Sequence, residues 1–372
     1  MLKVLQGISN HRQTASATYE VINQLKKQLI DIILFFCSDN YDFKEASFLF
    51  YQNFPNTRCV GSVVAGGISK AGFTDQSIVA IGLSSPGLQI EVTVIEEIET
   101  IPMIYRERVA SSFQKLKVNL EENNTFGILF VDGLRNAEEK VLSVIQSIFP
   151  TQEFPLIGGS AGDNGKFVET LSYNGSVYSN AAILTTIKTN HPFFLYRENI
   201  FIPKSEPLIV TKADIRDRKI YEINHVPAAK YYAKEIGVMV EQLSNYFMSH
   251  PFGRLYKNEY WIASPFQINP DLSITTYAQI IPNSEIYIMK PLDPVEVAKK
   301  TASIIANEVN KPKAILAFSC VLRNIQFKKE KNGQAVYKAL SKSCDLFGAT
   351  TYGEQIGRFH LNHTLTLLAI GE

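Results

Sequence analysis

This chain of 372 residues contains an imperfect sequence repeat in three copies. Each copy consists of a strand, a helical pattern, a glycine-containing segment and a second strand. Each copy opens with a nearly continuous apolar run, which is typical of a central strand buried on both faces. The three runs are Ile32–Cys37, Phe126–Val131 and Ala314–Cys320. The second strands are Ile78–Leu83, Ala181–Ile187 and Thr364–Ile370. Three related folding units are therefore the first expectation, two in the N-terminal half and one in the C-terminal half.

Glycines follow an apolar pair or triplet in each copy. They are Gly61, Gly66 and Gly67 in the first copy, Gly158, Gly159 and Gly162 in the second, and Gly348 and Gly353 in the third. We expect tight turns here, with backbone N–H groups able to hold an anion. The alternative is that the repeat needs turns at equivalent places and binds nothing there.

Helix start signals separate the strands. They are Asp42 with Glu45, Asn136 with Glu139, and Asp293 with Pro294 and Glu296. Residues 14–30 read as an amphipathic helix, and residues 227–237 read as a short one that stops at a glycine. Between 191 and 226, and again between 252 and 291, short strands and turn signals dominate. The fold class predicted is mixed α/β, with mixed sheets covered by helices, and the domains predicted are 1–225 and 226–372.

Composition excludes several classes of function. The 37 Lys and Arg residues against 36 Asp and Glu residues leave a net charge of +1, so neither nucleic-acid nor membrane binding is expected. The longest apolar run is far shorter than the roughly 18 residues that span a bilayer. The N-terminus lacks the long apolar core of a secretory signal. Four separate cysteines form no CxxC pair, and we expect a cytoplasmic protein with reduced thiols.

The motifs resemble the FIST family over nearly the whole chain. Residues 58–73, 155–163 and 209–229 resemble FIST N domains, whereas 317–323, 347–354 and 361–366 resemble FIST C domains. This resemblance implies a non-catalytic sensory protein that binds a small molecule, such as an amino acid, and acts in signal transduction. The chain ends after its last strand with no output module, so it is similar to the standalone branch. That branch consists of haem-containing nitric oxide sensors that act on a separate histidine kinase.

Ligand-binding residues are predicted from repeat position and from this resemblance. The second and third copies share F-x-x-x-L-R-N at Phe130–Asn136 and Phe318–Asn324. An arginine just past a buried strand presents a planar fork that suits a carboxylate, and Glu354 would complement an ammonium group. The predicted set is Arg135, Asn136, Gly158, Gly159, Arg323, Asn324, Tyr352, Gly353 and Glu354. The alternative is that both asparagines are helix caps and both arginines solvate the loops.

A haem would need an axial ligand. The candidates taken here are His360, His363 and His225, and the absence of CxxCH makes any haem a non-covalent haem b. His360 and His363 are expected at the start of the last strand, where their odd spacing puts them on opposite faces. Each of them is alternatively an ordinary core or surface histidine.

Ser160 offers an enzymatic alternative, because residues 158–162 fit the letters of the G-x-S-x-G nucleophile elbow. That elbow needs a helix directly after the serine, whereas turn residues follow here. We therefore expect no hydrolase. A third alternative is a purely structural protein that binds a partner through an exposed apolar patch.

Overall fold

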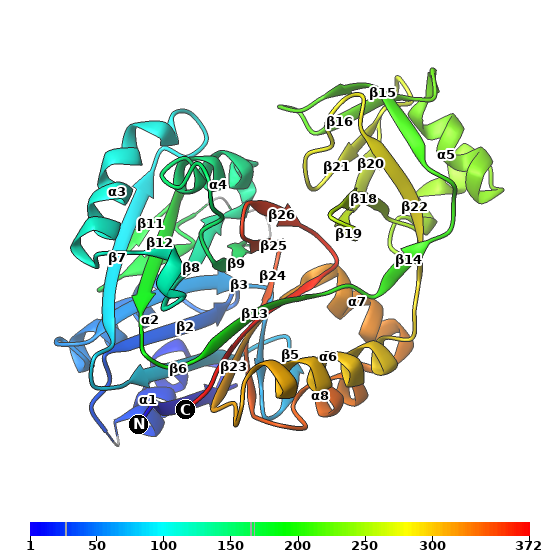
Figure 1. Cartoon of the computed structure of the whole chain (residues 1–372). Coiled ribbons are helices and arrows are strands. Elements are labelled where there is room, and N and C mark those ends of the chain that lie inside the picture. The colour runs from blue at the N-terminus through cyan, green and yellow to red at the C-terminus, as the bar shows by residue number, and fades with distance from the viewer. Residues whose placement is uncertain (27, 164–165, 167) are drawn as a thin grey trace. The chain divides into compact units, whose positions relative to one another are not determined.

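The computed structural model describes residues 1–26, 28–163, 166 and 168–372. The chain is mixed α/β, as predicted, and contains more strand than helix (Figure 1). It divides into two compact units, which are described separately. Unit 1 comprises Met1–Arg197, Ala298–Phe359 and Leu365–Glu372, and unit 2 comprises Glu198–Val297 and His360–Thr364. The sequence division at 225 does not coincide with these units, since unit 2 is inserted within unit 1.

Unit 1 is built on three six-stranded sheets whose strand orders are equivalent (Figure 1). The first is β1 (Lys3–Ser9), β6 (Ile78–Ser84), β2 (Ile32–Ser38), β3 (Arg58–Val64), β10 (Leu171–Tyr173) and β11 (Ser176–Tyr178). The second is β7 (Gln89–Glu96), β12 (Ala181–Lys188), β8 (Thr125–Asp132), β9 (Leu156–Ala161), β25 (Glu354–Ile356) and β26 (Phe359–Leu361). The third is β13 (Phe193–Glu198), β27 (Leu365–Ile370), β23 (Ala314–Cys320), β24 (Leu346–Thr351), β4 (Gly66–Ser69) and β5 (Gly72–Thr74).

Each sheet has the same mixture of strand directions. The opening strand of each repeat pairs in parallel with the strand after its helix, as β2 does with β3, β8 with β9, and β23 with β24. The opening strand also pairs antiparallel with the closing strand, β6, β12 or β27. The prediction of mixed sheets is therefore confirmed in detail.

The last two strands of each sheet are a hairpin supplied by another repeat. Hairpin β4–β5 of the first repeat adds to β24 of the third, and β25–β26 of the third adds to β9 of the second. Hairpin β10–β11 of the second repeat adds to β3 of the first and completes the cycle. Every repeat is thus hydrogen-bonded through its backbone to both of the others.

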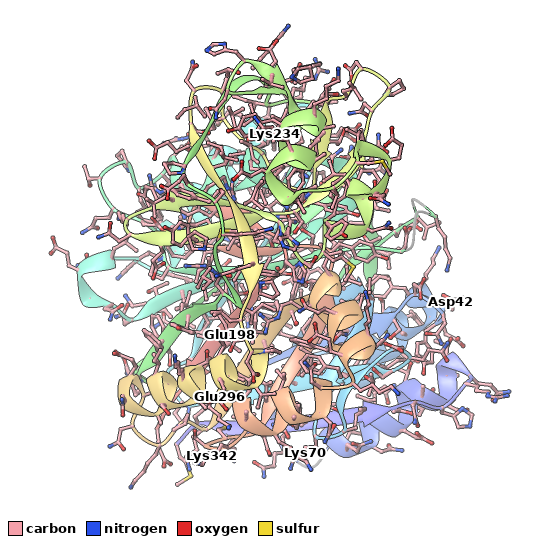
Figure 2. All side chains as sticks on the ribbon, turned by 90° about the vertical axis from the view of Figure 1, so that its right-hand side faces the viewer. Asp42, Lys70, Glu198, Lys234, Glu296 and Lys342 are labelled. Atoms are coloured by element: carbon pink, nitrogen blue, oxygen red, sulfur yellow. The ribbon has the colours of Figure 1, made fainter. Side chains whose placement is uncertain are left out.

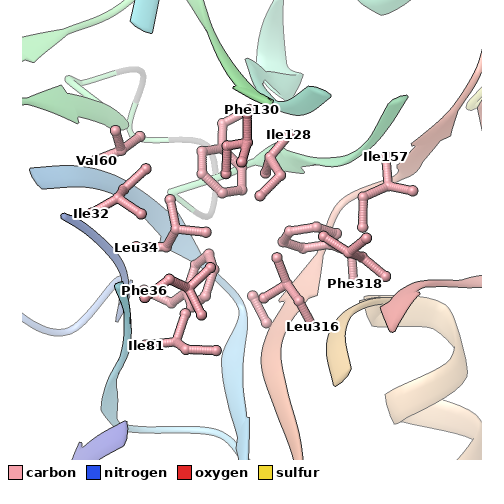
Figure 3. Close-up of a cluster of buried hydrophobic side chains, with 14 of the residues drawn as sticks. Ile32, Leu34, Phe36, Val60, Ile81, Ile128, Phe130, Ile157, Leu316 and Phe318 are labelled. Atoms are coloured by element: carbon pink, nitrogen blue, oxygen red, sulfur yellow. The ribbon is translucent and has the colours of Figure 1, made fainter. Parts of the chain in front are cut away.

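Three phenylalanines from equivalent positions meet in the core of unit 1 (Figure 3). Phe36, Phe130 and Phe318 are each at most 1% exposed. Their ring centroids lie 5.7 Å (Phe36–Phe130), 6.0 Å (Phe36–Phe318) and 5.6 Å (Phe130–Phe318) apart, and all three pairs are edge to face. Aromatic rings favour this geometry, because the positive edge of one faces the negative face of another. The triad joins the three sheets at one point.

The prediction of glycine turns is wrong for Gly158 and Gly348, which lie inside strands, whereas Gly353 lies in a bend between β24 and β25. Gly158 lies inside β9, where a Cβ atom would come within 2.0 Å of the Leu129 carbonyl oxygen. Gly348 lies inside β24 at φ +152°, where a Cβ atom would meet the Ala317 carbonyl oxygen at 1.8 Å. These glycines let paired strands approach closely, and their backbone N–H groups do not form an anion-binding turn.

The helices of unit 1 cover the sheets. They are α1 (Thr14–Leu25), α2 (Phe43–Asn53), α3 (Arg106–Lys115), α4 (Glu138–Gln146), α6 (Pro294–Glu308, which begins in unit 2), α7 (Val321–Glu330) and α8 (Gly333–Leu340), with short 3₁₀ turns η1 (Pro102–Tyr105), η2 (Leu120–Glu122) and η3 (Gly133–Arg135). Asp42 caps α2 as predicted, since its carboxylate accepts a hydrogen bond from Glu45 N at 2.9 Å. Figure 2 marks Asp42 at the start of α2 and Glu296 in the first turn of α6.

Unit 2 contains a nine-stranded sheet. Its strands are β19 (Glu259–Ala263), β18 (Phe252–Tyr256), β22 (Glu285–Pro291), β15 (Leu208–Asp214), β16 (Lys219–Ile223), β21 (Ile274–Thr276) and β20 (Pro265–Ile268), with β14 (Phe201–Pro203) beside β22 and β17 (Val226–Pro227) beside β16. The 3₁₀ turn η4 (Val240–Tyr246) and the predicted short helix, α5 (Ala228–Ile236), contribute to its core. Gly237 ends α5 at φ +83°, in the left-handed region that glycine tolerates.

Candidate functional site

The repeat places an equivalent polar residue beyond each opening strand. Asp42, Asn136 and Asn324 each follow their core phenylalanine by the same six positions. Beside the parallel pair that ends here, each sheet continues into the hairpin donated by another repeat, so unit 1 has three related inter-repeat positions. The three positions are filled differently.

The inter-repeat position of the second repeat is closed by hydrogen bonds. Ser160 Oγ donates to Glu138 Oε1 at 2.9 Å and accepts from Gln355 Nε2 at 2.9 Å. All three side chains are at most 2% exposed. Strand β9 runs on past Ser160 to Ala161, and residues 162 and 163 are not helical. The nucleophile-elbow geometry is therefore not formed around Ser160.

Several predicted residues lie side by side at this position. Glu354 pairs with Gly159 across β25 and β9, and Ser160 N donates to the Gly353 carbonyl oxygen at 2.8 Å. Tyr352 packs its ring against Gly162. Glu354 is fully buried and accepts a hydrogen bond from Thr351 Oγ1 at 3.0 Å. Gly158, Gly159 and residues 352–354, which repeat position and the family resemblance placed in one predicted ligand site, are thus neighbours in space.

Arg135 already has carboxylate partners. Its Nε lies 3.3 Å from Asp132 Oδ2 and its Nη1 lies 3.7 Å from Glu99 Oε2. Burial raises the pKa of the Asp132 carboxyl group, although hydrogen bonds from Asn180 N, Leu134 N and Arg135 oppose the rise. Asn136 is exposed at φ +49°, and α4 begins at Glu138 after Ala137. The prediction that Asn136 caps this helix is therefore wrong.

Arg323 and Asn324 have a different environment despite the shared motif. Helix α7 begins directly after β23, with Cys320 in the capping position, so Asn324 is not a cap either. Arg323 is fully buried, with its guanidinium carbon 5.2 Å from the centroid of the Phe327 ring. Asn324 Nδ2 donates to Thr350 Oγ1 at 2.7 Å. The third repeat has Cys320 where the second has Asp132, so this position supplies a carboxylate to Arg135 but a thiol near Arg323.

The inter-repeat position of the third repeat contains an open cavity of about 290 Å³, which we call the inter-repeat cavity. Six of its lining residues come from the third repeat and one comes from the donated hairpin. They are Asn324, Phe327, Lys328, Lys331, Gly333 and Gln334, with Phe73 from β5. The Phe73 and Phe327 ring centroids lie 5.8 Å apart at an interplanar angle of 56°. Of the predicted residues, Asn324 lines this cavity.

The corresponding position of the first repeat is smaller and more acidic. A cavity of about 210 Å³ is bordered there by Asp39, Asp42, Asp163 and Glu169, together with Lys44 and Lys166. The buried Asp163 carboxylate accepts hydrogen bonds from Lys166 N at 3.0 Å and Val168 N at 2.8 Å. A third cavity, of about 430 Å³, lies along β7 and α3 and is lined by both acidic and basic side chains.

Comparison with protein families agrees with the sequence motifs described above for residues 58–229 and 317–366. The FIST N domain model matches residues 31–226, and the FIST C domain model matches residues 228–357. This chain belongs to the FIST family. FIST domains are sensory domains of signal transduction that bind small ligands. A search of curated proteins finds no relative with significant similarity.

Three solved structures similar to this FIST protein are distant. Cyanuric acid hydrolase from A. caulinodans is 8% identical, with full coverage of both chains and a TM-score of 0.38. PurLQS from Thermotoga maritima is 10% identical over 99% of this chain and 72% of its own, with a TM-score of 0.23. A fatty-acid-binding DegV family protein from Streptococcus agalactiae is 13% identical over 39% and 54%, with a TM-score of 0.16. No conclusion about activity follows from scores this low.

The three histidines proposed for haem in this FIST protein all belong to unit 2. His360 is 3% exposed in β26, with Nε2 3.3 Å from the Tyr277 carbonyl oxygen. His363 is fully buried in the turn before β27, 4.7 Å from the Phe201 ring, and His225 is exposed in a turn at φ +62°. The expectation that His360 and His363 begin the last strand is wrong, because β27 begins at Leu365.

Haem ligation by these histidines stays a prediction, and their surroundings do not support it. An axial histidine needs a neighbouring space wide enough for the porphyrin, and no histidine lines any of the three cavities described above. Within the described residues, no group of three or more His, Cys, Asp or Glu side chains is arranged to hold a metal ion. No helix in that part of the chain is long and apolar enough to cross a membrane.

Sequence reasoning missed most of the inter-repeat cavity, including Phe73, Phe327, Lys331 and Gln334. The spacing of the last three gave no usable signal, because Phe327 lies in α7, Lys331 follows the end of α7 at φ +56°, and Gln334 lies in α8. Phe73 carried no signal either, because its place opposite α7 depends on the exchange of hairpins between repeats.

Proposed function

We propose that this protein is a cytoplasmic, non-catalytic sensor that binds a small organic molecule in the inter-repeat cavity and signals to a separate effector such as a histidine kinase. The observation that carries the proposal is the origin of the cavity walls. Phe73 belongs to the hairpin of the first repeat, whereas Asn324, Phe327 and Gln334 belong to helices of the third. A molecule bound there contacts two repeats at once, so binding changes how they pack.

Among the described residues, the donated hairpin and its flank contact the third repeat through the Phe73–Phe327 ring pair and two exposed ion pairs. Lys70 and Asp345 pair at 2.9 Å with both side chains substantially exposed, and Lys328 pairs with Asp75 in a similarly exposed position. Exposed ion pairs contribute only about 0–1 kcal/mol each. The backbone ladder between β4 and β24 spans only three residue pairs, Gly66–Thr350, Gly67–Ala349 and Ile68–Gly348. Ligand contacts of a few kcal/mol are therefore large enough to shift the hairpin between two arrangements.

A bound molecule acts on signalling only through a difference in affinity between two arrangements of the protein. In this proposal, the arrangement with β4–β5 closed against α7 and α8 binds the ligand more tightly, and the effector distinguishes the closed from the open arrangement. The free-energy difference required is modest, because allosteric coupling energies are typically about 1–3 kcal/mol.

A thermal-shift screen tests the proposal. The wild-type protein is screened against a panel of amino acids, organic acids, amines and neutral aromatic molecules, and each hit is repeated on Gln334→Ala. Gln52→Ala is the matched control, because Gln52 is an exposed glutamine of α2 outside the cavity. The proposal predicts at least one hit whose shift is reduced in Gln334→Ala and unchanged in Gln52→Ala. Ligand binding in the inter-repeat cavity would be refuted if every hit gave the same thermal shift in Gln334→Ala as in the wild type, or if the panel gave no hits.

A further inference from the structure

We propose that the ligand of the inter-repeat cavity is a planar aromatic carboxylate of about one ring. This inference rests on the proposed function, since it names the chemical class recognised at the same site. It follows from three properties of the cavity: an aromatic wedge, a lining that is basic without a carboxylate, and a volume with room for one ring.

The aromatic wedge consists of Phe73 and Phe327. Their rings are inclined at 56° with centroids 5.8 Å apart, so they present a face and an edge to the same space. Phe327 is 2% exposed and fixed in place, with the Arg323 guanidinium over its ring, whereas Phe73 is only partly buried. A flat ring packs against such a pair in the tilted or offset geometry that aromatic contacts favour.

The charge of the lining selects for an anion. Lys328 and Lys331 line the cavity, and its other polar groups are the amides of Asn324 and Gln334. No carboxylate is among its lining residues. Lys328 is paired with Asp75, whereas Lys331 forms no ion pair within the described part of the chain. An ammonium group and two amides are suitable donors to a carboxylate.

The other two cavities show that this charge is specific to the third repeat. The equivalent position of the first repeat is bordered by four carboxylates, and the cavity along α3 combines Glu91 and Glu96 with Arg108 and Lys115. Those sites would accept a cation or a zwitterion at least as well as an anion. In the inter-repeat cavity, no carboxylate is among the lining residues to neutralise an ammonium group, so an anion is a better match than a free amino acid.

The volume has room for one ring and its carboxylate. The cavity measures about 290 Å³, whereas an apolar cavity of about 150 Å³ already holds a benzene ring. A molecule the size of benzoate is therefore small enough for this space.

The test uses benzoate with three analogues that each change one property. Benzamide removes the charge, benzylamine reverses it, and cyclohexanecarboxylate keeps the charge but removes the planar ring. Binding is measured by calorimetry and by thermal shift on the wild-type protein at millimolar concentrations. Benzoate is expected to bind saturably, cyclohexanecarboxylate more weakly, and benzamide and benzylamine not at all.

Two substitutions connect the binding to the cavity. Lys331→Ala should weaken benzoate binding about three- to tenfold, because it removes a charged donor. Lys311→Ala is its matched control, since Lys311 is exposed with a similar backbone, at φ +51° against +56°. Phe73→Leu should remove the preference for benzoate over cyclohexanecarboxylate, whereas Phe48→Leu on the exposed face of α2 should keep it.

Every outcome bears on the proposal. Saturable benzoate binding that depends on Lys331 and Phe73 supports it. Binding of benzylamine or benzamide in preference to benzoate, still dependent on Phe73, overturns the ligand class but keeps the sensor site. Benzoate binding unaffected by both cavity variants, or absent at millimolar concentration, overturns the aromatic carboxylate. The panel screened on Gln334→Ala then decides whether the site itself also fails.

Discussion

Replacing Gly333 should separate stability from ligand binding at the inter-repeat cavity. Gly333 is the first residue of α8, and an added Cβ atom would lie 3.5 Å from Phe327 Cβ and 3.9 Å from Phe73 Cδ2. Both distances are ordinary van der Waals contacts, so alanine fits without strain. Gly→Ala at such a position stabilises a protein by about 0.4–1 kcal/mol, mainly because the unfolded chain loses freedom. Gly333→Ala should therefore raise the free energy of unfolding.

The same side chain enters the space that the ligand needs. A methyl group takes up about as much volume as a water molecule, roughly 30 Å³, so alanine fills about a tenth of the cavity. The larger side chain of Gly333→Leu would begin 3.5 Å from Phe327 Cβ and 3.9 Å from Phe73 Cδ2, and it should conflict with a ring bound against these two phenylalanines. A steric conflict of about 1–3 kcal/mol corresponds to binding about 5- to 150-fold weaker.

Chemical denaturation and calorimetry with the cavity ligand measure the two effects on the same samples. Gly237→Ala is the control, because Gly237 has φ +83° and does not line the cavity. It should destabilise the protein by about 1 kcal/mol and leave binding unchanged. The reasoning is refuted if Gly333→Leu binds the ligand as tightly as the wild type does.

Three further predictions concern the core, the pH dependence and haem. Phe130→Ala should lower the free energy of unfolding by about 3–5 kcal/mol, because it leaves a cavity and removes both edge-to-face contacts of that ring; a loss near 1 kcal/mol in denaturant titrations would contradict the aromatic triad. Burial lowers the pKa of His191, whose Nε2 is hydrogen-bonded to Ser85 Oγ at 2.8 Å. As the pH falls, His191 therefore takes up a proton in the unfolded state before it does so in the folded state. The free energy of unfolding should decrease as the pH falls below about 6.5, and it should decrease less in His191→Asn. Protein purified from haem-supplied cells should show no Soret band if the ligand is the organic molecule proposed above, whereas a band that disappears on substitution of His363 would show that this residue ligates haem.

The sequence predicted the elements that are encoded locally. Asp42 and Glu45 gave the start of α2, Pro294 gave the start of α6, and the apolar runs gave the three central strands. Capping and burial patterns depend on neighbouring residues, so these signals can be interpreted without tertiary structure. The same local reasoning failed at Asn136, because Gly133 begins a short 3₁₀ turn and the helix starts only at Glu138.

The candidate site was harder to predict because it depends on contacts between repeats. Arg135 and Arg323 share a motif, yet one is paired with Asp132 near the surface and the other is fully buried over Phe327. Phe73 reaches the inter-repeat cavity only because β4–β5 pairs with β24, more than 270 residues further along the chain. Pairing partners at such separations are not encoded in any short motif.

Amide hydrogen exchange of β4–β5 tests the central claim most directly. The protein is compared with and without the best ligand from the panel, and exchange is followed in residues 66–74 and, as an internal reference, in β10–β11. Ligand binding should slow exchange in β4–β5 and at the start of α8 and leave β10–β11 unchanged, because the ligand joins Phe73 to the helices of the third repeat. Protection elsewhere, with β4–β5 exchanging at the same rate in both samples, would contradict a sensor that works through the inter-repeat cavity.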